Sequence, residues 1–320
     1  MKSKYPHLII LYGRFGDRQH EKQQAMIYGG SVCGYRDYAK QFGEIIYLCP
    51  QDTKENWDSD IRFYNNDPKR IINKIKNWYP DSIIWSVKHD PTKQKDRLLE
   101  QLPNKKVFYS CCSYDTTNSS CDISLVDTPE RVKGNAVLWV KGKDPEFWKP
   151  QGSKKVFDYC MIGKRGDKNE VWFIDQLTDK IKEKRNIIWI GGEKHAYKMK
   201  KSHHNIACTQ FSGPVDVRNY IDLAKVGILL SEIPAEGMPQ SLIEMLIMGL
   251  PVVYLGPQSP LYKCRGMILQ KTKDNAVVYA ENELKSIWID RSNRVLVDAV
   301  ETFSLEKSYE SILRGLKYDI

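Results

Sequence analysis

The sequence contains no long hydrophobic segment. Apolar runs such as Val226–Leu230 and Leu250–Leu255 are far shorter than the roughly 20 residues with which a helix spans a bilayer. The run Leu8–Tyr12 is also too short for the core of a signal peptide, and charged residues follow it at once. We therefore expect neither a transmembrane helix nor a secretion signal, and a cytoplasmic protein.

The cysteines form no C-x-x-C pair, although there are eight of them. A chain of 320 residues can bury a sizeable apolar core without covalent cross-links. We therefore expect reduced, mostly buried thiols rather than a disulfide framework.

A metal-binding motif is also missing. The one D-x-D match, Asp58–Asp60, lies in a polar stretch before an expected helix. His195, His203 and His204 have no partners at the spacing of metal ligands, and we interpret them as part of a polar surface loop. We expect a protein that works without a metal ion or other cofactor.

Positive charge is in mild excess and is not concentrated. The 49 Lys and Arg residues and 40 Asp and Glu residues give a net charge of +9, divided about evenly between the two halves of the chain. A nucleic-acid-binding module more often has a basic stripe or a named motif. Nucleic acid is therefore a disfavoured partner, and the charge suits anionic small molecules or an acidic surface.

The length and the order of the expected elements indicate two α/β domains, because one core rarely serves more than about 250–300 residues. Short β-type runs alternate with helical segments, as is typical of a parallel sheet with helices on both faces. In the first half we expect the strands Leu8–Tyr12, Ile45–Cys49, Ile83–Val87, Val107–Ser110, Ile123–Val126 and Ala136–Val140. In the second half we expect the strands Phe157–Ile162, Ile187–Ile190, Val226–Leu230 and Val252–Leu255. The polar stretch Pro150–Lys155 marks the boundary between the two domains.

The segment Ser231–Leu255 carries the most informative pattern. Glu236 and Glu244 stand eight positions apart, the first in a loop after a strand and the second in a helix predicted over Pro239–Met248. Carboxylates placed in this way can accept hydrogen bonds from the hydroxyl groups of a ligand.

The loop before this helix suits close contact with a ligand. Gly237 lets the backbone approach, Met238 follows it, and Pro239 fits the first helical turn, where its missing N–H costs little. The free N–H groups that come next favour an anion or a hydroxyl-rich group. They belong to Gln240, Ser241 and Leu242.

Ala235–Tyr254 resembles the signature of the retaining GT-B glycosyltransferases of glycosyltransferase family 4, with its E-x7-E pair, glycine-containing loop, helix and closing G-L-P-V-V. Val140–Pro150 and Cys121–Thr128 are similar to further segments of that family. The resemblance implies two Rossmann-like, doubly wound parallel-sheet domains that face a cleft. Residues 1–150, joined by a C-terminal helix at about 305–320, would form the acceptor side, and residues 151–304 the nucleotide-sugar side.

The resemblance also assigns roles to the signature and to a basic turn. Glu244 would accept hydrogen bonds from the ribose, and Glu236 would hold the donor sugar. The family balances the negative charge of the leaving diphosphate with an arginine and a lysine after the first strand of the second domain. Here Lys164 and Lys168 take that place, with Arg165 as the alternative to Lys164, and their spacing departs from that of the family.

The first domain matches less closely. Gly29–Gly30 is the candidate for a glycine pair at the phosphates, and Gly13 is the alternative. The family's sugar-contacting histidine would be His89, with Asp115 or the loss of the role as alternatives. Gly192 would lie in a loop near the base of the nucleotide.

The resemblance therefore implies a metal-independent retaining glycosyltransferase acting on a nucleotide sugar donor and a glycan or lipid-linked acceptor, compatible with peripheral membrane contact. A nucleotide-sugar epimerase or a donor-binding pseudoenzyme of the same architecture is the alternative, and a nucleic-acid-binding protein or DNA-base glycosyltransferase is disfavoured. The acceptor pocket would be built from the loops Gln51–Asn66, Lys88–Lys95 and Ser110–Ser120.

Overall fold

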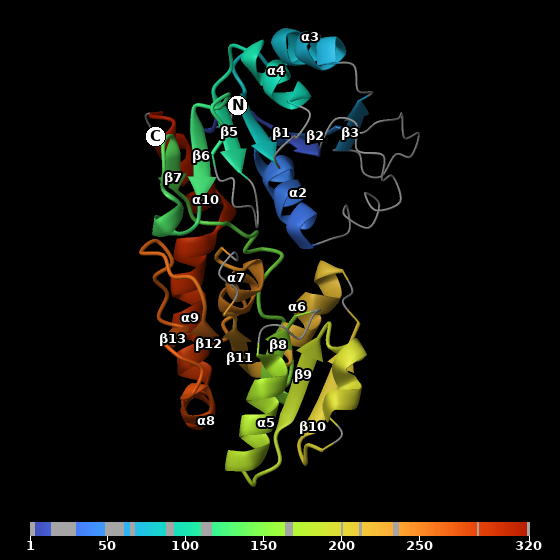
Figure 1. The fold of residues 1–320 in the computed structure, drawn as a ribbon, viewed down its shortest axis with the longest axis vertical. Helices are drawn as coiled ribbons and strands as arrows, with labels where there is room; N and C mark the ends of the chain where they lie inside the picture. Colours follow the sequence, from blue (N-terminus) through green and yellow to red (C-terminus); the bar gives the residue numbers. More distant parts are fainter. Residues whose placement is uncertain are drawn as a thin grey trace. The chain divides into compact units, whose positions relative to one another are not determined.

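The chain divides into two compact units in a computed structural model. Unit 1 comprises Met1–Trp139 with Tyr309–Ile320, and unit 2 comprises Val140–Ser308 (Figure 1). The structure describes residues 4–13, 30–48, 61–64, 68–87, 93–109, 117–163, 169–199, 201–210, 213–232, 237–286 and 288–318. None of the helices in these ranges combines the length and the hydropathy needed to cross a membrane.

Unit 1 contains a seven-stranded parallel sheet with the order β3-β2-β1-β4-β5-β6-β7. Its strands are β1 (Leu8–Gly13), β2 (Gly43–Leu48), β3 (Ile61–Tyr64), β4 (Ile83–Val87), β5 (Lys106–Tyr109), β6 (Ile123–Val126) and β7 (Ala136–Leu138). Its helices are α2 (Gly30–Phe42), α3 (Pro68–Trp78), α4 (Gln94–Glu100), the short η1 (Pro129–Arg131) and, from Tyr309 on, α10 (Leu305–Gly315).

Helices cover both faces of this sheet. On one face, Ile9 and Leu11 of β1 pack with buried residues of α3 and α4. On the other face the core is aromatic: Trp85 of β4 meets Tyr38 of α2 edge to face at 5.1 Å and Trp139 at 5.6 Å. Alternate residues of each strand point to opposite faces of the sheet. A strand that is buried on both faces therefore needs apolar residues at successive positions.

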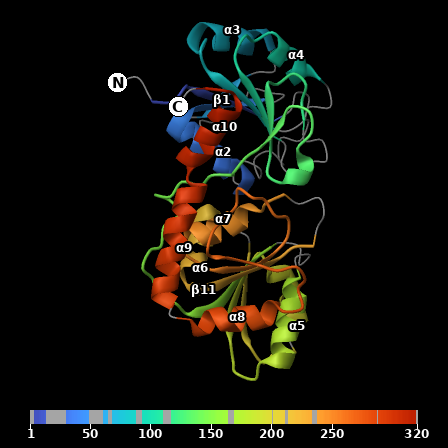
Figure 2. The same cartoon turned by 90° about the vertical axis from the view of Figure 1, so that its left-hand side faces the viewer.

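The C-terminal helix packs in unit 1 beside α2 (Figure 2). The ring centroids of Phe42 and Tyr309 lie 4.4 Å apart, and the Tyr309 hydroxyl donates to the carbonyl of Pro6 at 3.0 Å. Tyr309 of α10 therefore adds to the aromatic face of the first sheet.

Unit 2 repeats the arrangement with a six-stranded parallel sheet of order β10-β9-β8-β11-β12-β13. Its strands are β8 (Phe157–Ile162), β9 (Asn186–Ile190), β10 (Asn205–Thr209), β11 (Ala224–Leu230), β12 (Val252–Leu255) and β13 (Met267–Leu269). Its helices are α5 (Glu170–Lys180), η2 (Glu193–Met199), α6 (Pro214–Asp222), α7 (Gln240–Ile247), α8 (Ala276–Lys285) and α9 (Trp288–Phe303). The predicted pair of doubly wound parallel sheets is confirmed.

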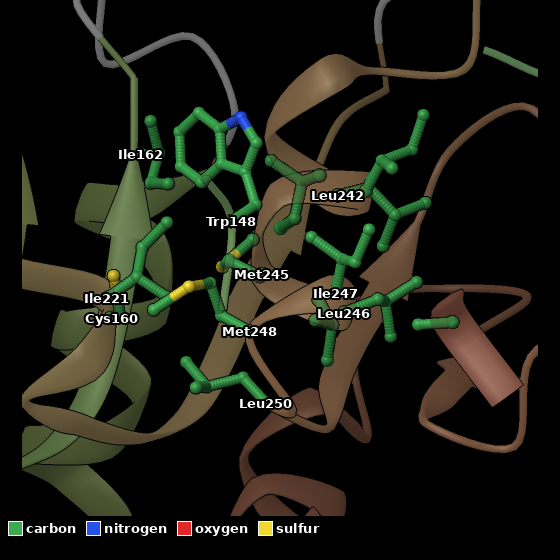
Figure 3. Packing of buried hydrophobic residues seen from close by; sticks show 14 of the residues in the cluster. Trp148, Cys160, Ile162, Ile221, Leu242, Met245, Leu246, Ile247, Met248 and Leu250 are labelled. Atoms are coloured by element: carbon green, nitrogen blue, oxygen red, sulfur yellow. The ribbon is translucent and has the colours of Figure 1, made fainter. Parts of the chain in front are cut away.

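Two hydrophobic layers enclose the second sheet. Helices α5 and α8 cover one face, and α6, α7 and α9 cover the other. Trp148 lies in the second layer with Ile162 and Met245 (Figure 3). The segment that contains Trp148 therefore belongs to unit 2, which begins before the boundary we placed at residue 150.

Helix α7 ends at a glycine in the left-handed region. Gly249 has a φ of +77°, and the Leu250 N–H donates to the carbonyl of Met245 at 3.0 Å, which is the pattern of a Schellman cap. A Cβ added at Gly249 would lie 2.7 Å from the Ser292 hydroxyl. We expect Gly249→Ala to lower the free energy of unfolding by more than the roughly 1–2 kcal/mol of left-handed strain alone, as measured by urea denaturation.

Gly152 provides the matched control for this substitution. Its φ is +73°, and nothing lies within 4 Å of an added Cβ. Gly152→Ala should therefore show the conformational strain without the collision. Equal losses of stability in the two variants would contradict the contribution of the Ser292 contact.

Candidate functional site

The signature helix α7 begins as the sequence predicted. Pro239 precedes it in an extended conformation with φ of −74° and ψ of 141°, and Gly237 and Met238 are buried. One expectation was wrong: the Leu242 N–H is not free, because it donates to the carbonyl of Pro239 at 3.2 Å. The N–H groups of Gln240 and Ser241 have no backbone partner within the described ranges.

Glu244 lies in α7 with its carboxylate in a charged pair. Its Oε1 accepts a hydrogen bond from Lys143 Nζ at 2.5 Å, and the side chains of Lys143 and Glu244 are only 3% and 11% exposed. The same ammonium donates to Gln240 Oε1 at 2.9 Å and lies 5.2 Å from the ring centroid of Trp148. Glu244 is therefore held by a cation inside an otherwise apolar layer.

A second buried lysine holds the loop before α7. Lys141 Nζ donates to the carbonyl of Met238, and the Lys141 N–H donates to the Tyr262 hydroxyl at 2.9 Å. From sequence, this segment was notable only for its likeness to a family, and the role of its two lysines was not predicted. The signal was a glutamate within the apolar run Leu242–Ile247, which needs a cation nearby because an unpaired buried charge is costly.

The two segments expected to contact the donor, the basic turn and the signature loop, follow strands β8 and β11 of the second sheet. Strands β8 and β11 are parallel neighbours, so their carboxyl ends lie at the same edge. Asn169, just after the basic turn, donates to the carbonyl of Leu230 at 2.9 Å and to Glu232 Oε2 at 2.9 Å. Lys273 Nζ donates to Glu232 at 3.0 Å, and this hydrogen bond lowers the pKa of that carboxyl.

Several predicted site residues lie outside the described residues: Glu236, Lys164, Arg165, Lys168, His89, Asp115 and Gly29. The same holds for the D-x-D match at 58–60. Within the ranges that are described, no group of three His, Cys, Asp or Glu side chains is placed to hold a metal ion.

Two of the other predicted glycines, Gly13 and Gly192, have structural reasons to be glycine. Gly13 ends β1 with a φ of +106°, and an added Cβ would lie 2.9 Å from the carbonyl oxygen of Leu48. Gly192 follows β9, and its Cβ would lie 2.3 Å from the indole of Trp189. Gly30 is the first residue of α2. The contacts of Gly13 and Gly192 account for these two glycines without a ligand, and the proposed contact of all three with the donor is untested.

A buried lysine also lies at the carboxyl ends of the central strands of unit 1. Lys95 Nζ donates to the carbonyls of Val87 at 2.8 Å and Gly13 at 3.1 Å, which end β4 and β1. The strand order reverses between these two strands, which is where open α/β sheets commonly bind ligands. Lys95 ends the range Lys88–Lys95 that we assigned to the acceptor pocket, and it lies in α4.

His204 differs from its predicted surface position. It is buried, its Nδ1 accepts a hydrogen bond from the Arg185 N–H at 3.2 Å, and burial lowers its pKa. It therefore has a structural role at the start of β9.

The chain is similar to known glycosyltransferases in sequence and in structure. Residues 158–280, which include the whole signature, match the family described as Glycosyl transferases group 1. The chain has the GT-B fold. It is similar to the structure of AviGT4, a glycosyltransferase involved in avilamycin A biosynthesis, with 13% identity, a TM-score of 0.63, and coverage of 98% of this chain and 97% of that one.

Two further GT-B structures cover the chain almost completely. Sucrose-phosphate synthase from Thermosynechococcus elongatus has 11% identity and a TM-score of 0.63, with 98% of each chain covered. An alpha-glucosyltransferase in complex with UDP and a 13-mer DNA has 10% identity and a TM-score of 0.66, with 98% of this chain and 100% of that one covered. At these identities the likeness concerns the fold. No curated protein sequence is significantly similar to this chain.

Proposed function

We propose that this protein is a retaining, metal-independent glycosyltransferase that resembles family 4 and moves a sugar from a nucleotide diphosphate sugar to an acceptor hydroxyl. The observation that supports this most is the placement of Glu244. Its carboxylate is buried on α7, within the segment that matches the group 1 glycosyl transferases, and one of its oxygens is already bound by Lys143. The other oxygen is the proposed acceptor for a ribose hydroxyl.

The proposed reaction breaks the bond between the anomeric carbon and the β-phosphate oxygen. The acceptor oxygen forms the new bond on the same face of the sugar, and the departing phosphate takes the acceptor proton. Negative charge grows on that phosphate as the bond breaks, so nearby cations and N–H donors stabilise the transition state. Lys168 and either Lys164 or Arg165 would supply the cations, and Glu236 would orient the donor sugar.

Binding of nucleoside diphosphates tests the donor site. UDP, GDP, ADP and CDP would be titrated by calorimetry, and we expect at least one to bind. Glu244→Gln should weaken that binding about ten- to a hundredfold, because a hydrogen bond to a charged group contributes about 1.5–3 kcal/mol. Glu301→Gln, at an exposed position of α9, is the matched control and should bind as the wild type does.

Product analysis tests the reaction class. Nucleotide sugars carrying the best-bound base would be incubated with the protein, and NMR of the transferred sugar should show the anomeric configuration of the donor. Transfer should continue in EDTA. An epimerised sugar formed without an acceptor would contradict a transferase, and wild-type affinity in Glu244→Gln would contradict the assigned site.

A further inference from the structure

Lys143 is fixed at both its backbone and its tip. Its N–H donates to the carbonyl of Phe303 at 2.8 Å, and its own carbonyl accepts from the Leu305 N–H at 3.0 Å. At the other end, its ammonium binds Glu244 and Gln240 over the face of Trp148. A lysine tied down in this way has few rotamers left, so it can hold a partner in one orientation.

The pair leaves one carboxylate oxygen available. Lys143 binds Oε1 of Glu244, and no other hydrogen bond to this carboxylate occurs in the described part of the chain. The Glu244 side chain keeps 11% of its surface exposed, whereas Lys143 keeps 3%. Of the two side chains, Glu244 therefore keeps the larger surface for contact with a ligand.

The charge of the pair matters for an anionic ligand. A lone carboxylate repels a diphosphate, and this repulsion is stronger in a partly buried site than in water. With Lys143 at 2.5 Å, the pair carries no net charge. The carboxylate can then accept a hydroxyl hydrogen bond without opposing the phosphates nearby.

We propose that Lys143 is a positioning residue for the donor: it orients Glu244 toward the ribose and neutralises it, so that a nucleoside diphosphate is accepted. This inference rests on the proposed function. Lys143 acts through Glu244 and does not itself contact the ligand.

A double-mutant cycle tests this. Dissociation constants of UDP, GDP, ADP and CDP, and of the nucleoside of the best binder, would be measured for Lys143→Met, Glu244→Gln and the double variant. Lys143→Met should raise the dissociation constant of the diphosphate about tenfold or more, and that of the nucleoside less, because the nucleoside carries no phosphate charge. In the Glu244→Gln background the same substitution should change nucleoside binding less than about twofold, because the carboxylate that Lys143 orients is already gone, whereas the diphosphate still loses the attraction of the ammonium.

Three further variants test the effect of charge, of position and of folding. Lys143→Arg keeps the charge and should restore most of the affinity. Lys149→Met is the matched control, because Lys149 lies in the same segment with its side chain 55% exposed and pairs with Glu146 at the surface. Lys143→Gln, whose amide can still donate to Glu244, replaces the methionine variant if circular dichroism shows that the latter does not fold.

The possible results distinguish a failure of the role proposed for Lys143 from a failure of the proposed function on which it rests. Diphosphate binding by the wild type with no loss in Lys143→Met overturns the proposal for Lys143, and nucleoside losses that are equal in the presence and absence of the Glu244→Gln substitution overturn its positioning role alone. A loss for the nucleoside as large as that for the diphosphate overturns the neutralising role. Absence of binding by the wild type to all four diphosphates overturns both proposals.

Discussion

Lys168→Ala is expected to lower the turnover of sugar transfer about 10²–10³-fold, the size of effect seen when one charge-stabilising donor is removed from a transition state. Lys168 follows β8, whose carboxyl end lies beside that of β11, the strand that leads into the signature loop. A cation from this turn would neutralise the diphosphate as it departs. Because this charge grows during bond breaking, kcat should fall more than the donor affinity.

The measurement is release of the nucleoside diphosphate from a saturating nucleotide sugar, with Kd for the diphosphate determined separately. Lys194→Ala, an exposed lysine of η2, is the matched control and should keep wild-type turnover. A variant at Lys168 with unchanged kcat would mean that another residue stabilises the leaving group. Alanine substitutions of Lys164 and of Arg165, measured in the same way, then distinguish these two cations, since turnover should fall only when the residue that contacts the diphosphate is replaced.

The central strands could be predicted from sequence because parallel strands buried on both faces consist of continuous apolar residues. Ile83–Val87, Phe157–Ile162 and Val252–Leu255 lie where the sequence analysis placed them. Among the edge strands, β7 was predicted, and β3, β10 and β13 were missed. The segment assigned to an acceptor loop contains β3, and β13 has three residues, one of them 46% exposed, so neither has a distinctive pattern.

The candidate site could be predicted where its pattern is local. The spacing within the signature placed Glu244 on a helix after a strand, and the structure agrees. Its partner Lys143 lies 101 positions away in sequence, so no local pattern could pair the two. Charged residues in a segment between domains are usually solvated, and only the packed structure shows that Lys143 is buried.

Glu281→Ala is expected to lower the free energy of unfolding by about 3 kcal/mol, the lower end of the range for breaking a buried ion pair. Glu281 of α8 accepts hydrogen bonds from the Tyr159 hydroxyl at 2.7 Å, from Arg185 Nε at 2.9 Å and from Arg185 Nη2 at 2.6 Å. Its removal leaves the fully buried Tyr159 hydroxyl without that acceptor. Arg185 keeps Glu183 at 2.8 Å as a partner at the surface, which limits the loss.

The dependence on pH provides a second, independent measurement on Glu281. Burial acts to raise the pKa of this carboxyl, but the hydrogen bonds from Arg185 and Tyr159 outweigh it, and the pKa lies below the ordinary value of 4.5. The stabilisation is therefore complete above the pKa of the unfolded chain and is lost as pH falls through the lower folded value. Urea denaturation of the wild type and of Glu281→Gln at pH 7 and near pH 4 should show a gap in stability that narrows in acid. The control Glu301→Gln, at an exposed position of α9, should have the stability of the wild type at pH 7. A stability difference between the wild type and Glu281→Gln that stays constant with pH would mean that the carboxylate charge does not stabilise this face of the sheet.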